Sequence, residues 1–175
     1  MEIRLEDFTT AVIERIEDFK PQIIDSWLAD YEGYRNCGDI RTNAHFTKTG
    51  TQILMQAELH GNIIGVCSRC LEDAIIPIDT DFTIIFLPSS QQRKYTEDEE
   101  IELLSNELDF EYYKGNKIDV DYLFRESLLL AIPYSPLCSE SCKGLCQVCG
   151  GNLNRNECTC KKGKSVFNNI KLNLF

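Results

Sequence analysis

The nine cysteines of this 175-residue chain are the feature that most constrains its fold. Eight of them form close pairs, with one, two or three residues between the members of a pair. The pairs are Cys67/Cys70, Cys138/Cys142, Cys146/Cys149 and Cys158/Cys160. Two cysteines at such a spacing share one tight turn, where both sulfurs can reach the same tetrahedral zinc ion at about 2.3 Å. The eight cysteines therefore predict two complete four-thiolate zinc sites.

A local grouping is favoured for the last two pairs, because a site closed by short loops loses little chain entropy. Its ligands would be Cys146, Cys149, Cys158 and Cys160. The glycines that follow Cys149 would let backbone amides of the turn face the thiolates. The other site would then contain Cys67, Cys70, Cys138 and Cys142. That site would link the C-terminal segment to the rest of the chain. The sequence leaves other groupings of the pairs open.

Other cysteine chemistry fits the chain less well. The N-terminus is acidic and no apolar run approaches the roughly 20 residues of a membrane span, so we expect a cytoplasmic protein in which disulfides are disfavoured. A redox Cys-x-x-Cys pair opens a helix, whereas a strand pattern follows Cys70. Catalytic zinc needs an open position, and His45 and His60 stand alone on the polar sides of expected strands. We predict structural zinc, no enzymatic activity and an idle or packed thiol at Cys37.

Charge divides the chain into an acidic body and a basic tail. The net charge is -10, but residues 138–175 hold six bases and two acids, a local charge of +4 that leaves -14 for the remainder. Nucleic-acid affinity rests on neutralising phosphates, so the body is a poor RNA binder by itself. Direct phosphate contact would fall to the lysines of the tail, which are Lys161, Lys162 and Lys164. Eight acids between Glu97 and Glu111 are typical of a solvated surface segment.

Alternation of apolar and polar residues predicts an antiparallel β meander in the middle of the chain. The inward positions of the first strand are Ile40, Thr42, Ala44 and Phe46, and those of the second are Ile53, Met55, Ala57 and Leu59. A turn is expected at Gly61 and Asn62. A long strand after Cys70 would point Ala74, Ile76, Ile78, Phe82, Ile84 and Phe86 inward.

The segments on either side of the meander predict helices. Residues 9–19 are compatible with a helix stopped by Pro21, while residues 23–34 show no clean period. After a long polar loop at residues 88–100 and a short strand at 109–113, Asp119 or Asp121 can cap a late helix. Its buried side would carry Leu123, Phe124, Leu128 and Ala131, and Asp121 would pair with Arg125. Prolines at positions 133 and 136 would end it.

The predicted fold class is α+β. Residues 1–137 would form a body with an antiparallel meander and a late helix. Residues 138–175 would form a cysteine-rich, zinc-bound module with a basic tail.

The cysteine-bearing segments carry a family resemblance. Residues 66–72 around Cys67-Ser-Arg-Cys70, residues 118–133, residues 136–154 and Cys158-Thr-Cys160 together resemble the YceD family of bacterial large ribosomal RNA subunit accumulation proteins. These segments stand in the family's order, whereas the first 40 residues match only loosely. Cys67 and Cys70 correspond to the family's Cys-x-x-Cys, and the later cysteines correspond to a tail that many members carry.

The resemblance implies a role in the accumulation or processing of large-subunit ribosomal RNA in the bacterial cytoplasm, and it supplies no catalytic residue. We expect a non-enzymatic ribosome-biogenesis factor that binds a basic large-subunit ribosomal protein or a pre-ribosomal particle. Two alternatives stay open: a generic zinc-dependent protein-interaction module, and a thiol redox or metal sensor.

Overall fold

The computed structural model describes residues 1–92, 110–155 and 158–160. The tail lysines Lys161, Lys162 and Lys164, and most of the acidic run, lie outside the described residues. Its elements in chain order are β1 (Glu2–Arg4), η1 (Leu5–Asp7), β2 (Val12–Phe19), α1 (Pro21–Leu28), β3 (Arg35–Asn36), β4 (Ile40–Thr49), β5 (Gln52–Val66), β6 (Asp73–Pro88), η2 (Ser89–Gln91), β7 (Phe110–Tyr113), β8 (Lys117–Asp119) and α2 (Asp121–Ala131).

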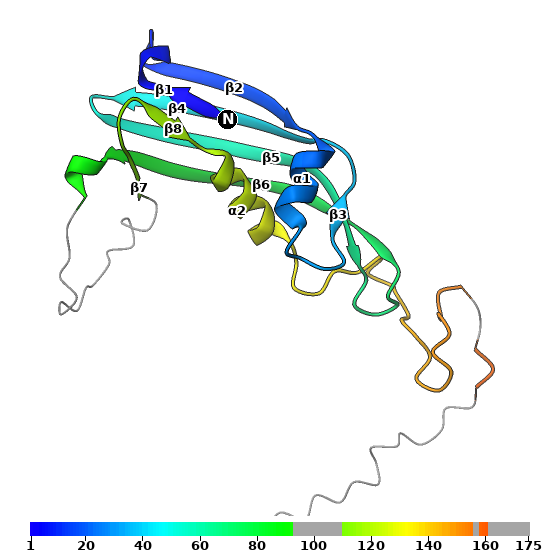
Figure 1. Cartoon of the computed structure of the whole chain (residues 1–175). Coiled ribbons are helices and arrows are strands. Elements are labelled where there is room, and N and C mark those ends of the chain that lie inside the picture. The colour runs from blue at the N-terminus through cyan, green and yellow to red at the C-terminus, as the bar shows by residue number, and fades with distance from the viewer. Residues whose placement is uncertain (93–109, 156–157, 161–175) are drawn as a thin grey trace, which may run out of the picture. The chain divides into compact units, whose positions relative to one another are not determined.

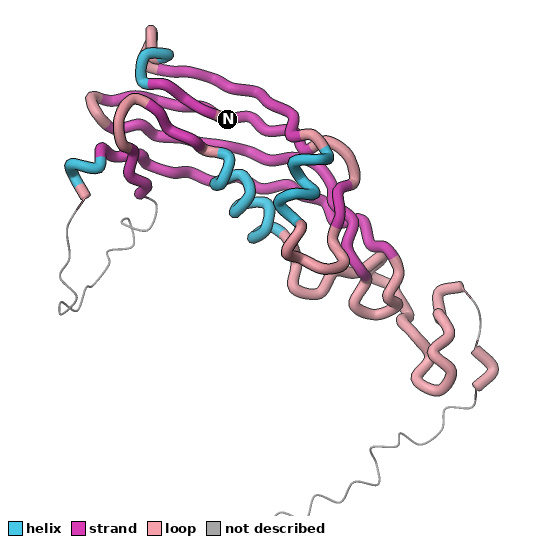
Figure 2. Tube along the Cα trace, viewed as in Figure 1, coloured by secondary structure: helices cyan, strands magenta, loops and turns pink. Residues whose placement is uncertain are grey.

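The chain divides into two compact units. The sheet unit comprises Met1–Gly65 and Ile75–Tyr134, and the cysteine unit comprises Val66–Ala74 and the chain from Ser135 onward. The turn that carries the first Cys-x-x-Cys thus belongs with the later cysteines. Figure 2 shows that residues 135–155 and 158–160 of the cysteine unit are mostly loop.

The sheet unit contains a six-stranded mixed sheet. Five of its strands follow the order β2-β4-β5-β6-β7, and the sixth, β3, pairs with the C-terminal part of β5. The pairs β2–β4 and β4–β5 are antiparallel, as the meander predicts. β7 differs, because it pairs with β6 in the parallel sense, from Ile85↔Phe110 to Pro88↔Tyr113. β1 and β8 form a separate antiparallel ribbon.

The alternating pattern places side chains as the sequence predicts. On β4 the residues Ile40, Thr42, Ala44 and Phe46 are completely buried. On β5 the residues Ile53, Met55, Ala57 and Leu59 are buried, and on β6 so are Ala74, Ile76, Ile78 and Phe86. Phe82 and Ile84 are partly buried against the same core. One face of the sheet is therefore apolar and the other is polar.

The turn expected at Gly61 does not exist, because β5 runs unbroken from Gln52 to Val66. A β-carbon at Gly61 would lie 2.9 Å from Cγ1 of Ile40 and 3.2 Å from its Cα. The glycine stands where β5 passes from pairing with β4 to pairing with β3. It permits a close backbone approach, which is the other common role of glycine inside a strand.

The N-terminal helix is predicted in the wrong place. Residues 12–19 form β2, an edge strand whose Ile13 and Phe19 face the core, and α1 begins at Pro21. A proline fits the first turn of a helix, where its missing N–H has no partner to lose. Pro21 therefore marks the start of a helix and not the end that the sequence predicts.

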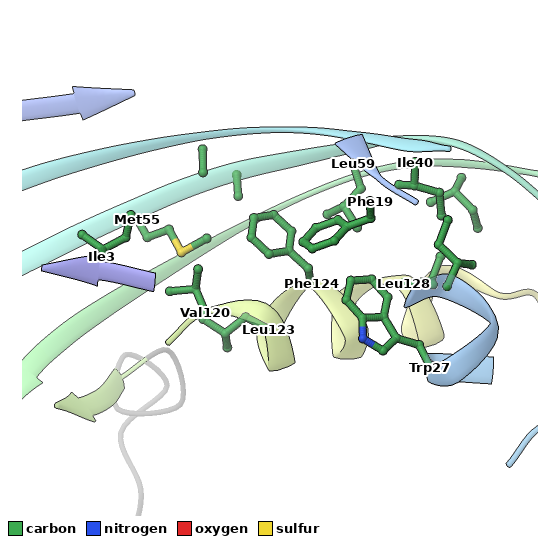
Figure 3. Close-up of a cluster of buried hydrophobic side chains, with 14 of the residues drawn as sticks. Ile3, Phe19, Trp27, Ile40, Met55, Leu59, Val120, Leu123, Phe124 and Leu128 are labelled. Carbon is green, nitrogen blue, oxygen red and sulfur yellow. The ribbon is translucent and has the colours of Figure 1, made fainter. Parts of the chain in front are cut away.

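The apolar core lies between one face of the sheet and the layer made by α1, α2 and β1 (Figure 1). Figure 3 shows Phe124 of α2 pointing toward Phe19 of β2, with Trp27 of α1 beside them. The Phe19 ring centroid lies 4.6 Å from that of Trp27 and 5.3 Å from that of Phe124. The late helix is confirmed, and its Leu123, Phe124 and Leu128 are buried.

Two details at α2 differ from the prediction. Asp119 accepts a hydrogen bond from the backbone N–H of Asp121 at 3.1 Å, but the N-cap residue is Val120, which has no side-chain acceptor. Arg125 lies 3.7 Å from Asp30 rather than pairing with Asp121. Neither helix within the described parts of the chain has the length and apolar content that crossing a bilayer requires.

Candidate metal centres

The cysteine unit gathers eight thiols into two groups of four. Cys67, Cys70, Cys138 and Cys142 form the first cluster, and Cys146, Cys149, Cys158 and Cys160 form the second cluster. Within each cluster the sulfur atoms all lie within 4.8 Å of one another. These are the two sets that the loop-closure argument favoured.

The first cluster is the more enclosed. Cys67 is completely buried, Cys70 and Cys142 are 3% and 4% exposed, and Cys138 is exposed. The sulfur of Cys67 lies 3.8 Å from that of Cys142, and the sulfur of Cys70 lies 3.6 Å from that of Cys138. Ala74, Leu137 and Leu145 pack against the buried cysteines of this cluster.

The second cluster is more open to solvent. Cys149 is exposed and the other three thiols are partly exposed. The Cys158 sulfur lies 3.3 Å from that of Cys146 and 3.6 Å from that of Cys149. Four sulfurs bound to one zinc ion at about 2.3 Å stand about 3.8 Å apart, so both clusters have nearly the spacing that a tetrahedral ion requires. A disulfide would bring two sulfurs to about 2.05 Å.

The two Cys-x-x-Cys turns have the same hydrogen-bond pattern. The N–H of Leu71 donates to the carbonyl of Cys67, and that of Cys67 donates to the carbonyl of Glu72, at 2.9 and 2.8 Å. In the second turn Gly150 donates to Cys146 and Cys146 donates to Gly151, again at 2.9 and 2.8 Å. In the second turn the backbone N–H of Val148 also donates to the sulfur of Cys146, at 3.4 Å.

The residue after each second cysteine adopts a left-handed conformation. Gly150 has φ of 70° and Leu71 has φ of 61°. Glycine takes this conformation without penalty, whereas a leucine with its β-carbon loses roughly 1–2 kcal/mol there. The side chain of Leu71 is 65% exposed, so the packing it gains inside the described structure is small.

Polar groups around the first cluster hold its two chain segments together. The backbone N–H and side-chain hydroxyl of Ser68 both donate to the carbonyl of Pro136, at 2.9 and 2.7 Å. The Arg69 guanidinium donates to the carbonyl of Cys142 at 3.0 Å. Arg155 forms a 2.7 Å ion pair with Glu72. The first Cys-x-x-Cys turn is thereby joined to residues that follow it by more than 60 positions.

Sequence reasoning missed Asn154, which touches a candidate ligand directly. Its side-chain amide donates to the sulfur of Cys142 at 3.2 Å, and its carbonyl oxygen accepts from the N–H of Lys143 at 2.7 Å. Such outer hydrogen bonds orient a thiolate and stabilise its charge. An asparagine three residues after Gly151 gives no periodic signal, so only the structure shows this contact.

Crowding within the first cluster separates the pKa values of its thiols. Burial favours the neutral thiol of Cys67, but the backbone N–H groups of Cys138, Arg69 and Cys70 donate to it and lower its pKa to about 6. Hydrogen bonding to Cys70 and Cys142 raises the pKa of Cys138 to about 12. Cys67 thus ionises readily while Cys138 stays protonated, because two thiolates this close repel each other.

The second cluster repeats that division. The backbone N–H groups of Cys149 and Val148 lower the pKa of Cys146 to about 6. Hydrogen bonds to Cys158 and Cys149 raise the pKa of Cys160 to about 12. A divalent cation at the centre of either cluster would favour full ionisation, because it offsets the repulsion between the four charges.

The remaining candidates from the sequence lie apart from both clusters. Cys37 is an exposed free thiol in the sheet unit. His45 and His60 are about half exposed on the polar face of the sheet. Neither histidine belongs to a described group of metal-binding side chains.

Comparison with known proteins identifies the same region. A family described as large ribosomal RNA subunit accumulation protein YceD matches residues 55–171, about two thirds of the chain. An uncharacterised protein of Mycobacterium tuberculosis is 27% identical over 99 residues, which are 56% of this chain and 44% of the relative. The chain thus matches less than half the length of that relative. No solved structure matches.

Two plant proteins match shorter stretches. Both are called large ribosomal RNA subunit accumulation protein YCED homolog 1, chloroplastic. The Arabidopsis thaliana protein is 39% identical over 60 residues, 31% of this chain and 19% of its own length. The Zea mays protein is 44% identical over 46 residues, 26% of this chain and 16% of its own length.

Proposed function

Because this chain belongs to the YceD family of large ribosomal RNA subunit accumulation proteins, we propose that it is a non-enzymatic factor that supports the accumulation or processing of large-subunit ribosomal RNA. The family match over residues 55–171 is the observation that carries this proposal. In a bacterium such a factor would act in the cytoplasm, where the large subunit assembles. The family's name describes accumulation of an RNA and specifies no chemical reaction.

The immediate partner in this proposal is a large-subunit ribosomal protein or a pre-ribosomal particle. The formal net charge of -10 supports a protein partner, since ribosomal proteins are basic and RNA is repelled by acidic surfaces. Direct contact with RNA phosphate is assigned to the basic tail, through Lys161, Lys162 and Lys164. Exchanging these three lysines for glutamine would then weaken RNA retention and leave protein binding unchanged.

Each cysteine cluster in this proposal holds one structural zinc ion. The sulfur spacings of 3.3–3.8 Å and the all-thiolate donor sets support zinc. The chemistry supplied by the ions is structural, because four protein ligands leave no position open for water or substrate. Counting zinc per chain tests the grouping: Cys67→Ser and Cys138→Ser should each lose the same single ion, and Cys146→Ser should lose the other.

Depleting the protein and measuring precursor and mature large-subunit RNA tests the function. We expect mature large-subunit RNA to fall relative to small-subunit RNA, and wild-type protein to restore it. Unchanged RNA levels would overturn the proposal. Association only with non-ribosomal proteins would instead favour a general zinc-dependent interaction module.

A further inference from the structure

The polar face of the sheet carries a candidate binding surface whose residues all belong to the sheet unit. The other face of the same sheet packs against α1, α2 and β1 (Figure 1). The polar face has no such layer in the described structure, and its side chains are open to solvent: Glu14 is 52%, His45 48% and Glu58 58% exposed. A broad sheet face without a packed layer is where a partner can add one.

A hollow of about 400 Å³ lies on this face over β4, β5 and β6. Its polar lining comes from His45, Gln56, Glu58, His60, Asp79 and Asp81. His60 lies between two of these acids, with Nδ1 2.8 Å from Asp79 and Nε2 3.5 Å from Glu58. The contacts place carboxylates on both sides of the imidazole and so concentrate negative charge in the hollow.

Few positive charges oppose these acids. Two arginines of the described strands lie on this face: Arg41 of β4, which lies 3.4 Å from Asp18, and Arg35 of β3, which stands opposite Ile64 of β5. Glu14 lies 3.7 Å from His45 and adds a further carboxylate beside the hollow. Positively charged groups of a partner would therefore be attracted here, with an on-rate raised by the field.

Exposed apolar side chains lie on the same face of the sheet as the acidic hollow. Ile16 and Val12 on β2 are 67% and 52% exposed, and Ile75 near the start of β6 is 65% exposed. Next to Ile16 in the register is Asn43 of β4, whose Oδ1 is buried and accepts no hydrogen bond in the described structure. The face thus offers apolar contact, negative charge and a hydrogen-bond acceptor that has no donor.

We propose that this sheet face, from Ile16 across Glu58 to Asp79, docks a polypeptide segment in which lysine or arginine alternates with apolar residues. The carboxylates attract the basic side chains, Ile16 and Val12 contact the apolar ones, and a donor from the segment satisfies Asn43. RNA fits poorly because its phosphates meet acids. A second copy of this chain fits poorly because it would bring the same acidic face. The inference rests on the proposed function only in identifying the basic segment as part of a ribosomal protein.

Binding of a labelled peptide of alternating lysine and valine to the full-length, zinc-loaded chain tests the surface. We expect Glu58→Gln combined with Asp79→Asn to weaken binding about tenfold. Asp30→Asn combined with Glu32→Gln removes the same charge from the exposed loop after α1 and should change the affinity less than about threefold. Amide NMR shifts on binding should locate the peptide over β4, β5 and β6. Equal losses in both double variants, or shifts elsewhere, would overturn the inference.

Three further measurements separate the possible causes of a loss. Trp27 is buried on the opposite face, so unchanged tryptophan fluorescence shows that a variant is folded. A single-stranded RNA oligonucleotide that displaced the peptide would identify RNA as the occupant and contradict the proposal. In depleted cells the Glu58→Gln/Asp79→Asn variant should fail to restore large-subunit RNA. Full restoration would reject the docking surface and leave the proposed function standing, whereas unchanged RNA on depletion would reject the function alone.

Discussion

Leu71 and Gly150 hold the same left-handed position in the two Cys-x-x-Cys turns, with φ of 61° and 70°. A β-carbon at Gly150 would have no atom within 4 Å, so backbone strain alone decides the effect of a substitution there. We expect Gly150→Ala to destabilise the second cluster by about 1 kcal/mol, because alanine is disfavoured in this conformation. A zinc-competition titration should show weaker binding of one ion by roughly five-fold.

The matched change is Leu71→Gly, which relieves the same strain in the first turn. It should leave zinc affinity unchanged or slightly higher, since the leucine side chain is 65% exposed and contributes little packing. If Leu71→Gly weakened the first ion as much as Gly150→Ala weakens the second, strain at this position would not be the controlling factor.

The lowered pKa of Cys146, near 6, predicts which thiol of the second cluster reacts first in metal-free chains that still hold the folded turn. At pH 7 this thiol is mostly ionised, whereas Cys160, with a pKa near 12, stays protonated. Both side chains are partly exposed, so accessibility does not separate them. Because the thiolate is the nucleophile, a brief pulse of iodoacetamide given as the metal is withdrawn, before the turns of the cysteine unit open, should alkylate Cys146 before Cys160, as mass spectrometry can measure. The preference should shrink as the pH falls below 6 and Cys146 takes up its proton, and equal rates at pH 7 would contradict it.

At the scale of elements, α2 stabilises the sheet unit chiefly through Phe124. Its ring is completely buried, with centroids 5.3 Å from Phe19 and 5.6 Å from Phe82. We expect Phe124→Ala to lower the free energy of unfolding by about 3–5 kcal/mol, because it removes these contacts and leaves a cavity. Leu130→Ala on the same helix is the control. That leucine is 86% exposed, and urea denaturation should place its effect within about 0.5 kcal/mol of wild type.

Helices and strands with one apolar and one polar face could be predicted from the sequence. The inward residues of β4 and β5, and the buried side of α2, follow from alternation or helical spacing alone. β2 could not, because Ile13 and Ile16 are three residues apart as in a helix, yet only Ile13 is buried in the edge strand. Gly61 resembles a turn glycine because its role depends on Ile40, a residue distant in sequence. Close approach and edge position are tertiary properties that a local pattern does not contain.

The candidate metal centres were predictable for a different reason. Short spacings between cysteines restrict which thiols can meet, so loop length favours both groups of four before any tertiary contact is known, although it leaves other groupings of the pairs open. The surrounding contacts of Arg69, Glu72 and Asn154 were not predictable, because they join segments whose relative position is set only after the chain has folded.

At the scale of the whole molecule, the two units differ in what stabilises them. The sheet unit has a continuous apolar core that includes Phe19, Phe46, Phe86 and Phe124. Among the described residues of the cysteine unit, the buried group consists of Cys67, Cys70, Ala74 and Cys142, with Leu137 and Leu145 against it. So small an apolar cluster cannot offset the ordering of the loops around it, and about 10–16 kcal/mol of zinc binding would.

Removing the metal should therefore affect the units unequally. After treatment with a strong chelator and a reductant, we expect hydrogen exchange of the described amides from Ser135 onward to rise to unprotected rates. Amides of β4 and β5 should stay protected, because their hydrogen bonds belong to a sheet with its own core. The Cys37→Ser variant should respond as wild type does, since Cys37 belongs to neither cluster. Simultaneous loss of protection throughout the chain would show instead that the sheet unit also depends on the metal.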